Sequence, residues 1–175
     1  DSYDSIIASG PNAALPHARP TNRKLTKGDF IVMDFGALYN GYHADMTRTL
    51  LIGPATEKHK EIYNIVLKSQ LNGISVAKAD IACSLVDQAC RSIIDQNGYS
   101  KFFNHSTGHG IGLEVHTLPR IHKSNNELLK PNHVITIEPG IYLPDWGGVR
   151  IEDDCLITQD KCLPLNKSTK ELIII

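Results

Sequence analysis

Hydrophobic residues fall in short runs near both ends of the chain and at helical spacing in its middle. Phe30–Asp34 is a nearly continuous apolar run bounded by glycines, which predicts a buried strand. Asn40-Gly41 then supplies a two-residue hairpin turn, because both residues tolerate positive φ. The return strand is expected over about Tyr42–Ile52.

Apolar positions three and four residues apart predict two helices in the middle of the chain. The first is expected over Thr56–Val76, where Gly73 weakens the end. The second is expected over Asp80–Asn97, with Asp80 as its N-terminal cap and Gly98 as its end. Both helices are interpreted as scaffold.

The C-terminal third returns to strands. His133–Glu138 alternates between apolar and polar residues before Pro139-Gly140 breaks the run. Ile141–Leu143 and Val149–Ile157 are expected to flank a loop rich in glycine and proline, and Leu172–Ile175 forms a last strand. Strands, helices and strands in this order predict an α+β domain whose helices cover one face of a curved sheet.

The composition is that of a globular protein. The chain has 175 residues, of which 41% are hydrophobic and 21% charged, which suits one domain with a sizeable core. Its formal net charge of −1 gives no indication of a nucleic-acid or membrane-surface partner. The apolar runs are too short to span a membrane, and no signal peptide is visible. The chain starts at Asp1, so the true N-terminus is expected upstream.

Four cysteines are present, at Cys83, Cys90, Cys155 and Cys162. Both pairs have the spacing C-x6-C, unlike the tight C-x2-C of structural zinc sites. The pattern favours free, mostly buried thiols in a reducing compartment, and therefore a cytoplasmic protein. A cysteine zinc site or a disulfide is the alternative.

Two segments with acidic residues are built alike. Asp34 ends an apolar strand, a turn follows, and Asp45 lies on the return strand. Glu138 likewise ends a strand, and Glu152 lies beyond the next turn. We interpret this as a weak internal repeat, the remnant of a pseudo-twofold site.

The register of the first hairpin can be worked out from its turn. With Asn40-Gly41 as the loop, Tyr39 pairs with Tyr42 and Asp34 pairs with Thr47. Asp45 is then the diagonal neighbour of Asp34 on the same face, about 7–8 Å away at Cα. Two carboxylates at that separation can converge on one site.

The second hairpin admits two loops. A two-residue loop at Gly147-Gly148 would place Glu138 and Glu152 on opposite faces. A five-residue loop, Pro144–Gly148, puts them on the same face with the same diagonal offset, and we predict this longer loop.

Four acids on one buried site cannot all remain ionised without cations, although each alone could be an ordinary surface residue. Two divalent metals balance four carboxylates, and pairs about 3.5–4 Å apart, bridged by carboxylates and a hydroxide, are an established catalytic arrangement. Oxygen-rich ligation with one imidazole favours Mn²⁺, with Co²⁺, Zn²⁺ or Fe²⁺ as alternatives.

A histidine-rich block occupies Asn104–Arg120, where His105, His109 and His116 lie among three glycines. The glycines allow the backbone to pass close to a ligand. The imidazoles can supply one metal ligand and two groups that handle protons or stabilise an oxyanion.

These motifs together carry a specific resemblance. The segment GHGIGLEVH, followed by ITIEPGIY and VRIEDD and preceded by DFG and GYHADMTRT, resembles the pita-bread metallopeptidases. It is most similar to their proline-specific branch, Xaa-Pro dipeptidase (prolidase) and Xaa-Pro aminopeptidase. The resemblance covers almost the whole chain and implies the pita-bread fold, with pseudo-twofold halves, for residues 1–175.

The resemblance also implies a ligand set. Asp34 would chelate one metal, Asp45 and Glu152 would bridge both, and His109 and Glu138 would bind the second.

It further implies roles around the metals. His116 would hold the substrate carbonyl or the developing oxyanion, and His105 and His17 would face the substrate. Arg150 would pair with a ligating acid, and Tyr3 would hydrogen-bond a ligand carboxylate. The remaining histidines match no catalytic position and are expected to be surface or structural residues: His43, His59, His122 and His133.

The implied activity is metal-dependent hydrolysis of the Xaa-Pro bond at the N-terminus of dipeptides or longer peptides. A hydroxide bridging the metals would attack the carbonyl, and Glu138 would pass the proton to the leaving nitrogen. His105, IEPGIY and VRIEDD favour this branch over the methionine aminopeptidases, and the complete ligand set argues against a metal-free peptide-binding module. Thr117, where the family commonly has an acid, is a departure that concerns substrate detail.

The chain is also expected to be a fragment. The family's catalytic domain begins with two further helices, and the proline branch adds an N-terminal domain. The full-length protein is expected to be a homodimer. The sequence alone leaves the choice between dipeptides and longer peptides open.

Overall fold

The computed structural model describes residues 1–175, which form thirteen short strands, two α-helices and two 3-10 helices. In chain order they are β1 Ile6–Ser9, η1 Gly10–Ala14, β2 Phe30–Asp34, β3 Leu38–Tyr39, β4 Tyr42–His43, β5 Thr47–Leu51, α1 Glu57–Val76, α2 Cys83–Gln96, η2 Ser100–Phe102, β6 Gly108–Gly110, β7 Thr117–Ile121, β8 Val134–Ile137, β9 Gly140–Leu143, β10 Gly147–Arg150, β11 Asp153–Ile157, β12 Cys162–Pro164 and β13 Ile173–Ile174.

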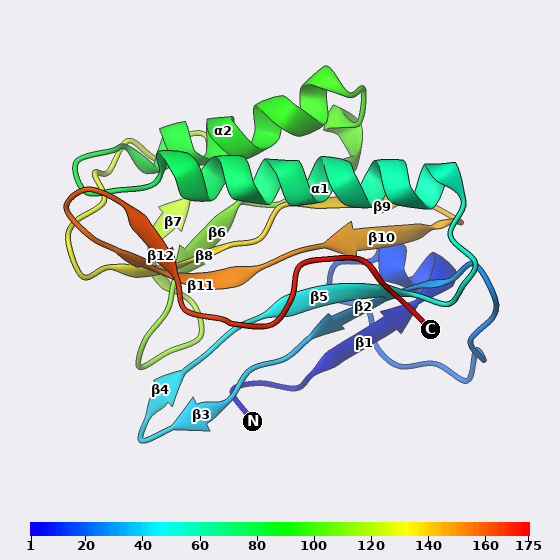
Figure 1. Cartoon of the computed structure of the whole chain (residues 1–175). Coiled ribbons are helices and arrows are strands. Elements are labelled where there is room, and N and C mark those ends of the chain that lie inside the picture. Colours follow the sequence, from blue (N-terminus) through cyan, green and yellow to red (C-terminus); the bar gives the residue numbers. More distant parts are fainter.

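The strands form two main sheets with the helices on one side of them (Figure 1). One sheet has the order β1-β2-β5-β13, and the other has the order β12-β11-β8-β6-β7. Every strand pair is antiparallel except β13, which runs parallel to β5 at the edge. This arrangement confirms the expected α+β class with helices on one face.

The core lies between the helices and the strands, in two clusters. Helix α1 places Ile62 and Val66, four residues apart and fully buried, against β9 and β10. Helix α2 packs Val86 and Cys90 over β8 and β11. Each fully buried aliphatic side chain stabilises the fold by about 1.5–3 kcal/mol. Neither helix is both long enough and apolar enough to cross a bilayer.

Gly73 sits where the two helices touch. A Cβ added there would lie 2.3 Å from Cys90 Sγ. The glycine therefore does more than weaken the end of α1, since it lets α2 approach closely. All four cysteines are free and buried, as predicted.

The two helices begin in different ways. Thr56 caps α1 and shares a capping box with His59, which is itself buried between Phe30 and Trp146. The predicted cap of α2 is wrong, because Asp80 has φ 64° and the helix begins at Cys83. The first amides of α2 instead donate to carbonyls of Glu127 and Asn125. A backbone partner from a distant loop has replaced the side-chain cap.

The register of the first hairpin is as predicted, with Tyr39 opposite Tyr42 and Asp34 opposite Thr47. The predicted five-residue loop of the second hairpin is wrong. Gly147 pairs with Leu143, so the loop has three residues and Arg150 lies opposite Gly140.

The pairing of β8 with β11 continues the same register, with Asp153 opposite Ile137. Glu138 and Glu152 are therefore directly opposite each other and not diagonal. They still share a face, because the side chains of a strand alternate with a period of two residues.

The two return strands are interrupted at corresponding places. The predicted strand Tyr42–Ile52 breaks at Asp45, whose amide donates to Asp154 Oδ2 of the other hairpin. The predicted strand Val149–Ile157 breaks at Glu152, whose amide donates to the carbonyl of Thr47. Each hairpin thus leaves its own ladder at its second acid and bonds to the other hairpin, as expected of pseudo-twofold halves.

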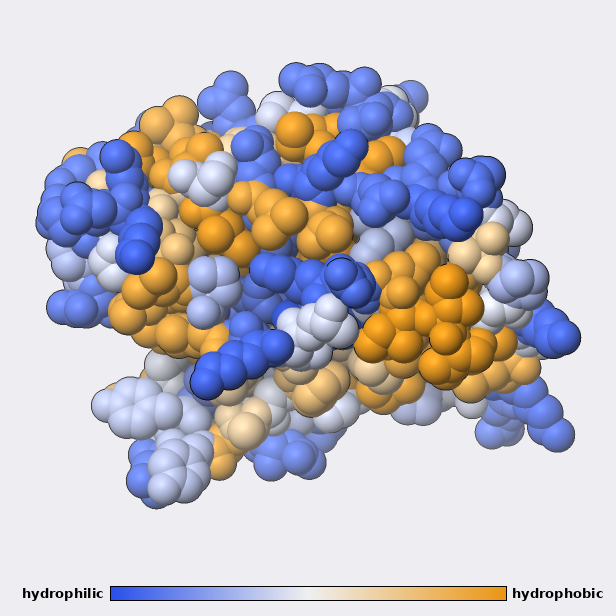
Figure 2. Space-filling view, in the orientation of Figure 1, coloured by the Kyte–Doolittle hydropathy of each residue, from blue (hydrophilic) through white to orange (hydrophobic).

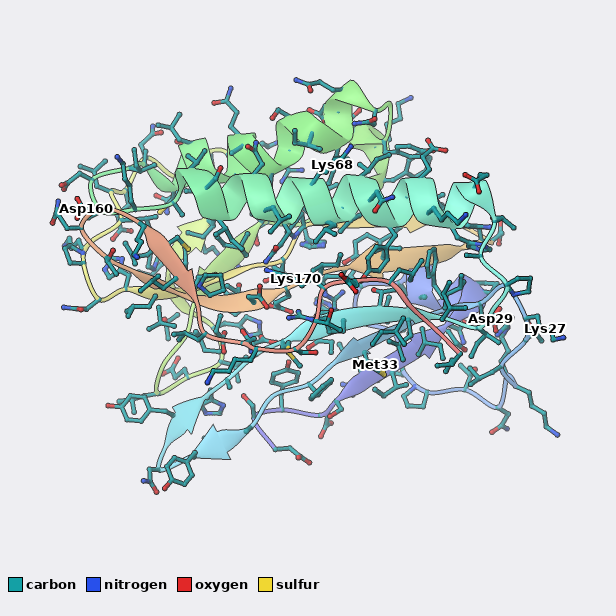
Figure 3. All side chains as sticks on the ribbon, viewed as in Figure 1. Lys27, Asp29, Met33, Lys68, Asp160 and Lys170 are labelled. Carbon is teal, nitrogen blue, oxygen red and sulfur yellow. The ribbon has the colours of Figure 1, made fainter.

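A buried ion network fastens the C-terminal segment to this seam. Lys170, labelled in Figure 3, comes from the segment that crosses the sheet beside β11, and its Nζ lies 2.6 Å from Asp153 Oδ2. Arg48 lies 2.7 Å from the other oxygen of Asp153 and also donates to the carbonyls of Ser168 and Thr169.

The chain then ends in an apolar stretch. Figure 2 shows hydrophobic residues gathered where the C-terminal segment crosses this face, and Ile173, Ile174 and Ile175 there are exposed.

Candidate metal centre

The four acids of the two hairpins line one cavity of about 1190 Å³. Asp34 ends β2 and Asp45 precedes β5, while Glu138 follows β8 and Glu152 precedes β11. The seam between the hairpins brings the four carboxylates together, because Asp45 and Glu152 are the residues at which the hairpins cross-link.

His109 supplies the imidazole from β6. Its Nδ1 lies 3.0 Å from the carbonyl oxygen of Gly110, so a neutral ring turns its Nε2 toward the acids. That Nε2 lies 3.3 Å from Glu138 Oε1 and 3.8 Å from Asp45 Oδ2. Donor atoms of Asp45, His109 and Glu152 all lie within 4.8 Å of one another, a spacing at which one cation could contact them.

The glycines beside His109 have a packing role. A Cβ at Gly108 would lie 1.9 Å from the carbonyl oxygen of Thr136, and one at Gly110 would lie 2.2 Å from that of Leu118. They let β6 fit between β7 and β8, so the close approach is to neighbouring strands.

Asp34 is bonded to side chains of the chain itself. Arg150 Nη2 lies 2.6 Å from Asp34 Oδ2, as the expected pairing of Arg150 with a ligating acid requires. The Tyr3 hydroxyl contacts both Asp34 Oδ1 and Asp45 Oδ1. Burial and the two carboxylates raise the pKa of Tyr3, so its hydroxyl remains a donor to them.

Burial makes these acids hard to ionise. It raises the pKa of Glu138 to about 8 and that of Asp45 to about 7, with the neighbouring acids contributing. The pKa of Glu152 is raised well above its usual value for the same reasons. Burial also lowers the pKa of His109 to about 4, which keeps the ring neutral and its lone pair available.

The donor set therefore fits divalent metal ions. Four carboxylates face one cavity, and Arg150 is the only guanidinium bonded to any of them. Cations at this position would remove the cost of ionising buried acids and would use the neutral imidazole as a ligand.

The other predicted histidines lie on the same cavity wall. The ring of His116 is 4.3 Å from that of His109, and His17 lines the cavity beside Pro16. His105 is held at both nitrogens: Nε2 lies 2.9 Å from the Tyr142 hydroxyl and Nδ1 lies 2.7 Å from the Ser106 carbonyl. Burial lowers the pKa of His105 to about 4.

Sequence reasoning missed three residues that hold the site together. Thr47 Oγ1 donates to Glu152 at 2.5 Å and accepts from Arg150 Nε at 3.0 Å. Thr136 Oγ1 accepts from the His109 amide and donates to Glu138. Tyr142 lies within 2.9 Å of both Arg150 and His105. Thr47 could have been found, because the predicted register places it opposite Asp34.

Comparison with known proteins agrees with this geometry. Residues 1–159 match the model of metallopeptidase family M24. The chain is 48% identical to an Xaa-Pro dipeptidase of Pyrococcus horikoshii over 98% of its own length and 49% of that protein. It is thus similar to about half of the relative.

Solved structures give the same result. The prolidase of Pyrococcus furiosus superposes with a TM-score of 0.94 at 47% identity, over 96% of this chain and 50% of that one. The X-Pro aminopeptidase of Thermotoga maritima superposes with a TM-score of 0.96 at 42% identity, over 99% and 49%. The likeness confirms the expected pita-bread fold, and with the family match it shows that the chain belongs to metallopeptidase family M24.

Proposed function

We propose that residues 1–175 are the catalytic domain of a two-metal peptidase that hydrolyses the Xaa-Pro bond at the N-terminus of a peptide. The proposal depends on one observation: four buried acids and His109 line a single cavity with too few protein cations to balance them. The names of the similar proteins, Xaa-Pro dipeptidase, prolidase and X-Pro aminopeptidase, support the substrate class.

In this proposal the five ligands divide between two ions. Asp34 would hold one ion, His109 and Glu138 would hold the other, and Asp45 and Glu152 would contact both. When bound, the ions would supply a water of lowered pKa and would offset the charge that develops on the substrate carbonyl oxygen.

The chain's own residues would then orient the peptide and move protons. His116, beside His109, would donate a hydrogen bond to the carbonyl oxygen as its charge grows. Glu138, on the same cavity, would receive the proton of the attacking water and pass it to the leaving proline nitrogen as the peptide bond breaks. His17 and His105 would contact the substrate from the cavity wall.

We extend the proposal to the ion, the compartment and the assembly. Oxygen-rich ligation with one imidazole favours Mn²⁺. Four free, buried thiols are in keeping with a reducing compartment such as the cytoplasm. The full-length protein would be a homodimer that acts on peptides, with no nucleic-acid or membrane partner.

The test uses the whole protein that contains this chain. Metal content is measured, and cleavage is assayed on an Xaa-Pro dipeptide, an Xaa-Pro tripeptide and a Met-Ala tripeptide, with and without a chelator. We expect two ions per chain, cleavage of the proline substrates alone, and loss of cleavage with chelator that added Mn²⁺ restores. Cleavage of Met-Ala would favour a methionine aminopeptidase, and peptide binding without turnover would favour a binding module.

A further inference from the structure

A fifth buried acid lies behind the ligands of the metal cavity. Asp154 is on β11, two residues after Glu152, and only 5% of its surface is exposed. It lies opposite Thr136 of β8, and opposite residues of antiparallel strands point to the same face. Because the Thr136 hydroxyl bonds to Glu138 and to the His109 amide, that face is the cavity side. Asp154 itself does not line the cavity, so it lies beneath the ligands.

The two oxygens of Asp154 have different surroundings. Oδ2 accepts a hydrogen bond of 2.9 Å from the amide of Asp45, at the point where the return strand of the first hairpin is interrupted. Oδ1 is buried and has no hydrogen-bond partner in the chain. No cation of the chain pairs with either oxygen, and Arg48 and Lys170 bond to the neighbouring Asp153. Asp154 is therefore a buried carboxyl group without a balancing cation in the chain.

A neutral side chain would hold the amide of Asp45 at a lower cost. Asparagine and threonine also offer an oxygen that accepts from an amide, and burying either costs less than burying an uncompensated carboxylate. The hydrogen bond alone thus does not account for an acid at position 154. A negative charge becomes favourable there when cations are bound on the other side of Asp45, because charges inside a protein are screened far less than charges on its surface.

We propose that Asp154 is a positioning residue of the metal centre, which anchors the backbone of Asp45 and strengthens ion binding through its charge without contacting the ions. The inference deepens the proposed function and rests on it. The hydrogen bond fixes where the carboxylate of Asp45 stands, and so affects turnover. The charge affects how tightly the site holds cations, and so changes the metal dissociation constant.

The experiment separates these two effects with four forms of the whole protein: wild type, Asp154→Asn, Asp154→Ala and Asp160→Asn. Asparagine removes the charge and keeps an acceptor for the Asp45 amide, whereas alanine removes both. Asp160→Asn is the matched control, because Asp160, labelled in Figure 3, is an exposed acid shortly after the end of β11. Mn²⁺ binding to each metal-free form is measured by titration calorimetry. Thermal unfolding of the metal-free forms and kcat at saturating Mn²⁺ are measured in parallel.

We expect Asp154→Asn to bind Mn²⁺ about 10- to 100-fold more weakly than wild type, the range typical of residues that support metal ligands. Its kcat at saturating Mn²⁺ should stay within about 3-fold of wild type, because the Asp45 amide keeps its partner. Its metal-free form should unfold at the same or a higher temperature, since it no longer buries an unpaired charge. Asp154→Ala should bind Mn²⁺ at least as weakly and also lose about 10-fold in kcat. Asp160→Asn should match wild type in all three measurements.

Three results would overturn the assignment of Asp154. They are Mn²⁺ binding by Asp154→Asn as tight as in wild type, a metal-free Asp154→Asn that is unfolded or less stable than wild type, or an equal weakening of Mn²⁺ binding by Asp160→Asn. Full kcat in Asp154→Ala would contradict the anchoring of Asp45 by the hydrogen bond.

Failure of the proposed function is a separate result. If wild type binds no Mn²⁺, the role of Asp154 falls together with the metal centre. If wild type binds Mn²⁺ and cleaves no Xaa-Pro peptide, the proposed function is wrong, and the dissociation constants of the four forms still decide the role of Asp154 in ion binding.

Discussion

Glu152 and Asp153 are consecutive buried acids whose surroundings differ completely. Asp153, fully buried on the helix side, lies 2.7 Å from Arg48 and 2.6 Å from Lys170 and accepts a hydrogen bond from Gln70. Glu152, only 1% exposed on the cavity side, accepts a hydrogen bond from Thr47 and has no bonded cation. One acid has two protein cations, and its neighbour has none.

The contrast separates a structural acid from a ligand. Burying a carboxylate costs several kcal/mol unless a cation and hydrogen bonds offset it. At Asp153 two cations of the chain offset the cost of burying the carboxylate: Arg48 from β5 and Lys170 from the C-terminal segment. No cation of the chain is bonded to Glu152, so a metal ion would be needed to offset the burial of its charge.

The largest expected effect comes from removing the charge of Glu152. Glu152→Gln should lower peptidase activity by a factor on the order of 10³ or more, because the site loses a ligand shared by both ions. Metal content should fall to one ion or fewer. The metal-free variant should be at least as stable as metal-free wild type, since an amide costs less to bury than an uncompensated carboxylate. Activity assays, metal analysis and thermal unfolding measure the three quantities.

Retention of two ions and normal activity in Glu152→Gln would contradict this interpretation. A marked loss of metal-free stability would also contradict it, because Glu152 would then be part of the scaffold like Asp153.

The second largest effect is expected at Asp153, where a substitution should change stability and leave metal binding intact. Asp153→Asn should destabilise the protein by about 3 kcal/mol, because Arg48 and Lys170 remain buried or half-buried beside a neutral amide. Denaturant unfolding of the metal-free form measures the change. Any variant that folds should still bind two ions. The comparison fails if Asp153→Asn unfolds at the same denaturant concentration as wild type.

How much of this site could be predicted follows from the range of the interactions. The turn at Asn40-Gly41 fixes the first hairpin locally, so the register of Asp34 followed from the sequence. The second hairpin lacks such a turn, and its three-residue loop could not be chosen from residue types alone. The observed register differs from the predicted one by two residues, so each side chain stays on the predicted face of the sheet. Glu138 and Glu152 therefore still share the site.

The ion network of Asp153 depends on long-range contacts instead. Arg48 is 105 residues away from Asp153, and nothing local indicates that it is the partner. The predicted start of α2 was wrong for the same reason, because carbonyls of the distant residues Asn125 and Glu127 accept the hydrogen bonds of its first amides in place of the cap expected from Asp80. Local signals therefore predicted the acids of the site, and tertiary packing decided which acid is compensated.

The smallest expected effect is the pH dependence of metal-free stability. Burial raises the folded-state pKa of Asp45 to about 7 and of Glu138 to about 8, whereas unfolded carboxyls titrate near about 4. Between about pH 4 and pH 8 the folded protein therefore holds protons that the unfolded chain has lost, and the contribution of these acids to stability falls as pH rises. Below about 6.5 the sign reverses for His105 and His109, because burial lowers their pKa to about 4 and the unfolded chain binds more protons.

Above pH 6.5 the acids decide the trend, so metal-free wild type should lose about 4 °C or more in Tm between pH 6.5 and pH 8.5, the shift that about 1–2 kcal/mol produces in a domain of this size. Mn²⁺ should raise Tm more at pH 8.5 than at pH 6.5, since the ion competes with the protons that the acids hold. Glu138→Gln removes one of these protons and should flatten the metal-free profile. A metal-free Tm that stays level or rises between pH 6.5 and 8.5 would mean that the four acids are balanced within the chain, and the distinction between Glu152 and Asp153 would then be lost.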